Sequence, residues 1–400
     1  MTIRFGRDFT VEKLSAALAA SFAFAWLICL LMMLHGHSWI LDAHGKPIVT
    51  DFLEVWVAGR TTLHGAAASA YDPTLHHAAQ VAAAGHEFHG FLWWHYPPVV
   101  LFVAAALALL PYLTAFLVWV ASTLACFALT VAAIARTRMA ALLACAMPAV
   151  FINAIAGQNG YFTATLIGCT LLNLETRPVL AGVFLGLLTY KPQFGILFPL
   201  VLVATGRWRA FVTASAVAAI MVLVPWAVFG SETLRAFAHF LPRAGDSLLV
   251  HGSAGWNKLQ TVYGFARWAG WEYLSASLLQ GAVGVAIAGA LIWLWRRDVP
   301  FGLKAAALAT ATMFATPYLY MYDFPLLAVA FAFLYLDRAF DRVELAGIAF
   351  ANLCILAFTF GLLVIPIGAV AAAATGGLVV RRAARELAKP FASHIALQAA

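Results

Sequence analysis

Long apolar runs separated by short basic turns dominate the chain. The first run, residues 14–34, follows a basic start and is about 21 residues long, enough to cross a hydrocarbon core of about 30 Å as a helix. No small-residue cleavage site follows it, so we expect an uncleaved first helix rather than a signal peptide. The later apolar runs that we expect to span are residues 113–135, 139–156, 161–174, 179–190, 194–205, 211–229, 278–295, 305–318, 324–336, 345–361 and 363–380.

Two polar stretches, residues 36–110 and 230–277, interrupt these runs. The first ends in a 12-residue apolar segment, residues 99–110, bracketed by prolines and short enough to be re-entrant or interfacial. If this segment does not span, 17 of the 24 Lys and Arg residues fall on the cytoplasmic side, as the positive-inside rule requires. We therefore expect about twelve transmembrane helices with both termini cytoplasmic.

This topology makes residues 1–400 one integral membrane domain. Both polar stretches become long extracytoplasmic loops, the first with juxtamembrane helices and the non-spanning segment, and residues 381–400 become a cytoplasmic tail. Neither ATP nor nucleotide sugars are available outside the membrane. Chemistry in these loops would need donors that are carried by lipid or already exported.

Composition agrees with an all-α polytopic membrane protein. The chain is 64% hydrophobic and 10% charged, with a mean hydropathy of +0.90, which excludes a soluble globule and a disordered chain. The net charge of +7 fits basic cytoplasmic loops better than nucleic-acid binding. The five cysteines lie in apolar runs without disulfide or zinc spacing. There is no Walker or dinucleotide motif, and we expect no cofactor.

A candidate catalytic carboxylate opens a predicted helix in the first loop. Phe52, Val55, Trp56 and Gly59 recur at helical spacing, which predicts a short helix on the membrane surface with Trp56 facing down. Asp51 would lie at its N-terminal end, where the helix dipole favours a carboxylate. It could accept a proton from an attacking hydroxyl. Alternatively, Asp51 only caps the helix.

Lys191 stands between two apolar runs, where an unpaired ammonium is costly. A phosphate headgroup would be a suitable partner, or the side chain could reach bulk water. Other polar groups at predicted outer helix ends are Gln158 and Asn159, and Asp323, which could orient a basic residue or sugar hydroxyls or cap the following helix. Nine of the twelve histidines fall between residues 35 and 95, but none has metal-ligand spacing, so we expect no metal site.

Several short motifs follow one another over residues 50–325. They are Asp51-Phe52, Ala58-Gly59-Arg60, Tyr71-Asp72, Tyr96-Pro97-Pro98, Leu110-Pro111-Tyr112, Gly157-Gln158-Asn159, Ala181-Gly182-x-x-Leu185-Gly186 leading to Lys191-Pro192, and Tyr322-Asp323. In these motifs and their order the chain resembles glycosyltransferase family 87, whose members have a GT-C-type fold. Many family members carry a histidine before the last motif, where this chain has Tyr318.

The resemblance implies transfer of a sugar, mannose by default, from a polyprenyl-phosphate donor to a lipid or polysaccharide acceptor. The reaction would occur without a metal at the extracytoplasmic face of a bacterial plasma membrane, and membrane lipids would be the other partners. Asp51 would be the catalytic base. Cations near the donor phosphate would be Lys191, Lys258 and Arg267, and sugar or acceptor contacts would come from Glu54, Arg60, Gln158, Asn159, Tyr322 and Asp323.

Three other functions fit parts of the pattern. A transporter or lipid flippase would need facing charged residues deep within the spans, whereas nearly all charges here fall in loops or at span ends. A structural subunit of an envelope complex would give Asp51 and Lys191 no special role. A ligase or phosphotransferase that moves a whole lipid-linked oligosaccharide would use the same outer loops.

Overall fold

The computed structural model describes residues 11–90 and 92–388, which form helices and helical turns plus one isolated bridge between Leu41 and Pro47. Six helices in this part are long and apolar enough to cross a membrane. They are α1 (Val11–His35), α5 (Tyr112–Ala135), α11 (Trp208–Gly245), α13 (Tyr273–Trp295), α16 (Arg342–Thr359) and α17 (Ile367–Leu387). The chain is thus an all-helical membrane protein, as predicted.

The remaining apolar runs form shorter helices. α6 (Arg138–Cys145) and α7 (Pro148–Ala156) are bent by 63° at Pro148 and could count together as a seventh span. The others are α8 (Gly160–Asn173), α9 (Pro178–Leu187), α10 (Leu197–Ala204), α14 (Phe301–Thr312) and α15 (Leu326–Asp337), with turns η2 (Leu188–Tyr190), η3 (Pro192–Phe194) and η6 (Met321–Asp323). The count of twelve spans and the GT-C fold therefore stay predictions.

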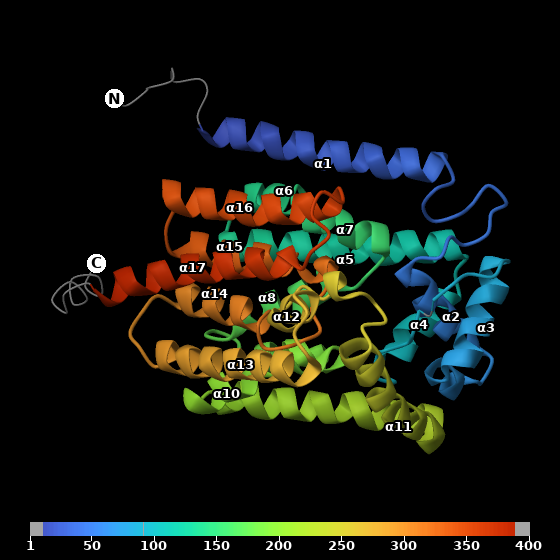
Figure 1. Ribbon diagram of the computed structural model, residues 1–400. Coiled ribbons are helices and arrows are strands. Elements are labelled where there is room, and N and C mark those ends of the chain that lie inside the picture. Colours follow the sequence, from blue (N-terminus) through green and yellow to red (C-terminus); the bar gives the residue numbers. More distant parts are fainter. Residues whose placement is uncertain (1–10, 91, 389–400) are drawn as a thin grey trace.

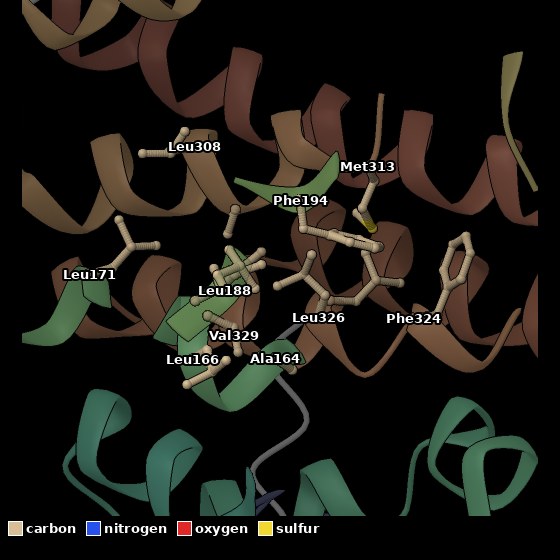
Figure 2. Packing of buried hydrophobic residues seen from close by; sticks show 14 of the residues in the cluster. Ala164, Leu166, Leu171, Leu188, Phe194, Leu308, Met313, Phe324, Leu326 and Val329 are labelled. Carbon is tan, nitrogen blue, oxygen red and sulfur yellow. The ribbon is translucent and has the colours of Figure 1, made fainter. Parts of the chain in front are cut away.

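The short helices occupy the middle of the molecule. In α14 and α15 nearly every side chain is buried, and the two helices pack on each other and on α17, while α15 also contacts α5 and α8. Five of the twelve residues of α14 are alanine, which lets the helices approach closely. Figure 2 shows side chains of α8, α14 and α15 in one apolar cluster with Leu188 and Phe194. By contrast, only 6% of the apolar stretches in α1 and α11 is buried.

The first polar stretch folds into a helical cap. It contains α2 (Asp51–Leu63), η1 (Ala67–Tyr71), α3 (Pro73–Ala84) and α4 (Val100–Ala108). α2 begins at Asp51 as predicted. It is not a surface helix with a single buried face, because Phe52 and Leu53 are both fully buried and α4 packs along it. A Cβ on Gly59 would come within 2.0 Å of the Ala104 carbonyl oxygen, so only glycine permits this approach.

The second polar stretch is also largely helical. α11 continues past Gly230, where a left-handed φ of 77° kinks it, and is followed by the π-helical turn η4 (Asp246–Val250), η5 (Trp256–Lys258) and α12 (Val262–Trp268). At the other end of the chain, α17 extends to Leu387. The predicted tail therefore begins as helix, and residues 389–400 lie outside the described part.

Two ends of the molecule are distinct. In Figure 1, α1 begins and α17 ends at the left, whereas α2, α3 and α4 lie at the right, together with the end of α11. At the left end a buried cluster joins α16 to α17: Arg382 is 3% exposed and its Nε donates to Glu344 Oε1 at 2.8 Å. The short helices are interrupted at Gly157, Lys191 and Asp323, and polar side chains at these breaks lie inside the molecule.

Candidate active site

One continuous chain of hydrogen bonds links polar side chains from distant segments. The segments are the start of α2, the residues before α4, the α7–α8 turn, the junction of η2 and η3, and η6. In the order in which the hydrogen bonds link them, the side chains are Asp51, Gln158, Tyr96, Asn159, Lys191 and Asp323. Five of these six residues were site candidates from the sequence, Asp51 as the base and the others as binding residues. Tyr96 was not.

The first links run from Asp51 to Asn159. Gln158 Nε2 donates to Asp51 Oδ2 at 3.1 Å. Tyr96 donates its hydroxyl to Gln158 Oε1 at 3.0 Å, and Asn159 Nδ2 donates to the Tyr96 oxygen at 2.6 Å. Burial is the main reason that the pKa of Tyr96 lies well above its usual range, so this side chain remains a neutral phenol.

The remaining links end at an ion pair. Lys191 Nζ donates to Asn159 Oδ1 at 3.0 Å and to Asp323 Oδ1 at 2.5 Å. Lys191 is 6% exposed and Asp323 is 1% exposed, so Lys191 does not reach bulk water. Its ammonium lies 5.2 Å from the centre of the Tyr322 ring. Asp323 uses its second oxygen to accept the Tyr320 amide at 3.1 Å, so it also caps its own turn.

Glycines bring these segments together. Gly157 has a left-handed φ of 66°, and Trp119 Nε1 donates to its carbonyl at 3.1 Å. A Cβ on Gly160 would lie 1.8 Å from the Tyr322 carbonyl oxygen. Its amide is held by Asn153 Oδ1 at 2.9 Å. The Gly157–Gly160 turn can therefore place its two amide side chains between α2 and η6 only because both ends are glycine.

Asp51 is not the N-cap of α2. Thr50 occupies that position, and the Asp51 carboxylate faces Gln158 instead. Burial raises the pKa of Asp51, while the Gln158 hydrogen bond and the positive charge of Lys258 oppose this rise. Glu54, one turn further along, has a pKa well above its usual range because it is buried and faces the charge of Asp51. Of these two carboxyl groups, Asp51 is therefore the one whose partners favour the charged form.

The other candidate cations differ in their surroundings. Lys258 is exposed at the end of η5, and Gln260 anchors this loop by donating to Leu319 O and accepting from the Gly368 amide, both at 2.7 Å. Arg267 instead donates to the carbonyls of Val250 and Trp271, each at 3.0 Å, and stacks over an indole.

Arg60 is exposed at the far end of α2, over the Trp56 ring. No hydrogen bond in the described part of the chain joins Arg60 or Arg267 to the polar chain. Across residues 11–90 and 92–388, no group of three or more His, Cys, Asp or Glu side chains could hold a metal ion. His76 is buried, and neither of its ring nitrogens has a hydrogen-bond partner.

An apolar cavity of about 440 Å³ adjoins the polar chain. Tyr96, Gln158 and Asn159 line one side of it. The other walls come from α4, α5, α8, α9 and α11, with Val103, Trp119, Phe162, Leu187 and Met221 among the lining residues. The cavity therefore offers apolar walls to a ligand that also has a polar group, and its polar side includes the direct partner of Asp51.

Sequence reasoning missed Tyr96 as a site residue. It belongs to the Tyr96-Pro97-Pro98 motif, which was noted as part of the family resemblance and as the start of the non-spanning segment, but not for its tyrosine hydroxyl. Its burial between two amide side chains depends on the cap folding over the α7–α8 turn. A tyrosine directly before two prolines was the available signal, since the prolines fix the backbone that presents it.

The family comparison covers the middle of this hydrogen-bond chain but not Asp51 or Asp323. A search of the curated proteins and of the solved structures gave no significant match. The model of glycosyltransferase family 87 matches residues 94–320, more than half of the chain, including Tyr96, Gln158, Asn159 and Lys191. The chain therefore belongs to glycosyltransferase family 87 and is a membrane glycosyltransferase.

Proposed function

We propose that this protein transfers a hexose, with mannose as the first candidate, from a polyprenyl-phosphate donor to a hydroxyl of a cell-envelope lipid or polysaccharide. The reaction would take place at the extracytoplasmic face of a bacterial plasma membrane. The observation that carries the proposal is the apolar cavity beside Gln158, the hydrogen-bond partner of Asp51. A donor with an isoprenoid chain and a polar sugar phosphate has matching apolar and polar parts.

Asp51 is the base in this proposal. It takes the proton from the acceptor hydroxyl as the acceptor oxygen attacks the anomeric carbon. The bond between that carbon and the phosphate oxygen breaks, and the lipid phosphate leaves with the bonding electrons. Attack from the face opposite the leaving group inverts the configuration, so a β-linked donor gives an α product. Gln158 supports the base because its amide donates to the charged carboxylate.

We assign the leaving phosphate to Lys258. Its side chain is exposed, and its charge acts on Asp51 across the site. Lys191, which we expected to bind phosphate, already has a carboxylate partner at 2.5 Å. A positive charge aimed at the leaving group stabilises the charge that develops in the transition state. Sugar hydroxyls would meet Glu54, Tyr322 and the free hydrogen-bonding positions of the two amide side chains.

The test compares donors in the purified protein in lipid nanodiscs. Polyprenyl-phosphate mannose, polyprenyl-phosphate glucose and GDP-mannose are supplied in turn, with total envelope lipid and polysaccharide as acceptors. We expect product from a polyprenyl-phosphate donor only. Product from GDP-mannose, or from none of the three, contradicts the proposal.

A pair of variants tests the cavity. Val103 lines it, so Val103→Trp should raise KM for a long-chain donor at least fivefold, about 1 kcal/mol of lost binding. Leu109 ends the same helix at 72% exposure and does not line the cavity, so Leu109→Trp should leave KM unchanged. Equal KM values in the two variants would remove the donor chain from this cavity.

A further inference from the structure

We propose that Lys191 and Asp323 are positioning residues, which act through Asn159, Tyr96 and Gln158 to fix the orientation of the Asp51 carboxylate. This inference rests on the proposed role of Asp51 as the base. It assigns to the buried ion pair a function other than contact with donor phosphate. The ion pair and the base belong to different segments of the chain, and only the folded protein connects them.

The argument begins with the direction of each hydrogen bond. The Lys191 ammonium can only donate, so it requires Asn159 to present its oxygen. The Asn159 amide group must then face Tyr96 and donate to its oxygen. Tyr96 has one hydrogen, and that hydrogen goes to Gln158 Oε1. The Gln158 amide group is left to donate to Asp51.

Each amide in the chain therefore has a single favoured orientation. If Lys191 lost its charge or its place, Asn159 could turn its amide group, and Tyr96 could then donate to Asn159. Gln158 Oε1 would keep only the Asn159 backbone amide, at 3.3 Å. The far end of the chain is a carboxylate, which can only accept when ionised. The order that Lys191 imposes is thus the one that favours an ionised Asp51.

Asp323 keeps Lys191 in place. Its first oxygen binds the ammonium at 2.5 Å, and its second oxygen accepts the Tyr320 amide, so the carboxylate is fixed within η6. η6 in turn touches the α7–α8 turn at Gly160. A donor phosphate at the Lys191 ammonium would have to compete with this carboxylate, which is 1% exposed.

The first experiment titrates Asp51 directly by infrared spectroscopy. The protonated-carboxyl band that disappears in Asp51→Asn identifies the group. Other titratable or charged groups that face Asp51 are Glu54 on α2, Tyr96, Tyr112 on α5, Lys258 in the second loop, and Tyr320 and Tyr322 around η6. Tyr96→Phe removes only the hydroxyl that links Asn159 to Gln158, and leaves these charges unchanged.

We expect Tyr96→Phe to move the Asp51 titration to higher pH by roughly one unit, the scale of a weakened hydrogen bond to a charged group. Tyr161→Phe is the matched control, because Tyr161 is fully buried and donates to the Val150 carbonyl, which is not part of the hydrogen-bond chain that ends at Asp51. An unchanged titration in Tyr96→Phe, or an equal shift in Tyr161→Phe, would overturn the inference. This readout requires no donor, so it stands apart from the proposed activity.

The second experiment separates positioning from binding. Lys191→Met together with Asp323→Leu removes both charges and leaves no buried ion unpaired, so this double variant should fold. A positioning role predicts that kcat falls at least tenfold while KM for the donor changes less than twofold. Lys258→Met, which removes the proposed phosphate contact, should raise KM as well as lower kcat. A raised KM with an unchanged kcat in the double variant would return Lys191 to the donor phosphate and refute the inference.

Discussion

At the scale of single residues, two carboxyl groups one turn apart on α2 have different surroundings. Asp51 has an amide donor and faces a lysine charge, whereas Glu54 is buried and faces the negative charge of its neighbour. The pKa of Glu54 is therefore raised further from its usual range than that of Asp51 is. Two such environments on one helix can separate a charged base from a neutral acid that contacts sugar hydroxyls.

Glu54→Gln should therefore keep transfer within about threefold of wild type. A folded-state pKa above the unfolded value of 4.5 means that wild type loses stability as pH rises from that value through the folded pKa. Glutamine cannot ionise, so the variant should be more stable than wild type at pH 7. The difference should vanish near pH 4.5. Thermal unfolding of both proteins across this pH range measures it, and a variant no more stable than wild type at pH 7 would contradict this assignment.

At the scale of elements, the site depends on the close approach of one helix start to one turn. The first residue of α8 meets η6, where a Cβ on Gly160 would overlap the Tyr322 carbonyl. Backbone on both sides leaves no flexible side chain that could move aside. Displacing η6 would move Asp323, and with it Lys191 and the rest of the polar chain.

Gly160→Ala should thus lower stability by about 1–3 kcal/mol and abolish transfer. Gly281→Ala in α13 is the control, since a Cβ there meets nothing within 4 Å. Helix propensity predicts that this control is neutral or stabilised by up to about 1 kcal/mol. Denaturation and transfer assays on both proteins measure the contrast. Normal transfer by Gly160→Ala would mean that η6 does not need this contact.

At the scale of the whole molecule, sequence patterns predicted the class of fold better than its internal arrangement. The all-helical membrane architecture follows from apolar runs that are visible in the sequence. Hydropathy gave the short lengths of α8, α14 and α15 but could not show that these helices are buried, because a buried helix and a lipid-facing one can have the same composition. Pro148 was visible in the sequence as a possible helix break, but the predicted span over residues 139–156 ran through it, whereas the structure has two helices bent there.

The site was predictable in its residues rather than in its contacts. Polarity next to apolar runs identified Gln158, Asn159, Lys191 and Asp323. Pairing of Lys191 with Asp323, across 132 positions of sequence, came from tertiary packing. Tyr96 was missed for the same reason, since its partners come from another segment.

The predicted topology can be tested with two cysteine variants at exposed positions. Glu87 lies in the cap between α3 and α4, and Thr176 lies between α8 and α9. In intact cells, a membrane-impermeant maleimide should label Glu87→Cys, whereas Thr176→Cys should react only after permeabilisation. The protein with its native cysteines alone gives the background. The reverse pattern would place the site at the cytoplasmic face and remove the argument for an exported donor.

The most direct test of the central claim is transfer of radiolabelled mannose from polyprenyl-phosphate mannose by membranes containing wild type or Asp51→Asn. Asparagine preserves the shape of the side chain and removes the base. We predict labelled product with wild type and a loss of at least a thousandfold in the variant, which should still bind the donor. Equal transfer by the two proteins would contradict the assignment of Asp51, and no transfer by wild type from any polyprenyl-phosphate sugar would contradict the proposed function itself.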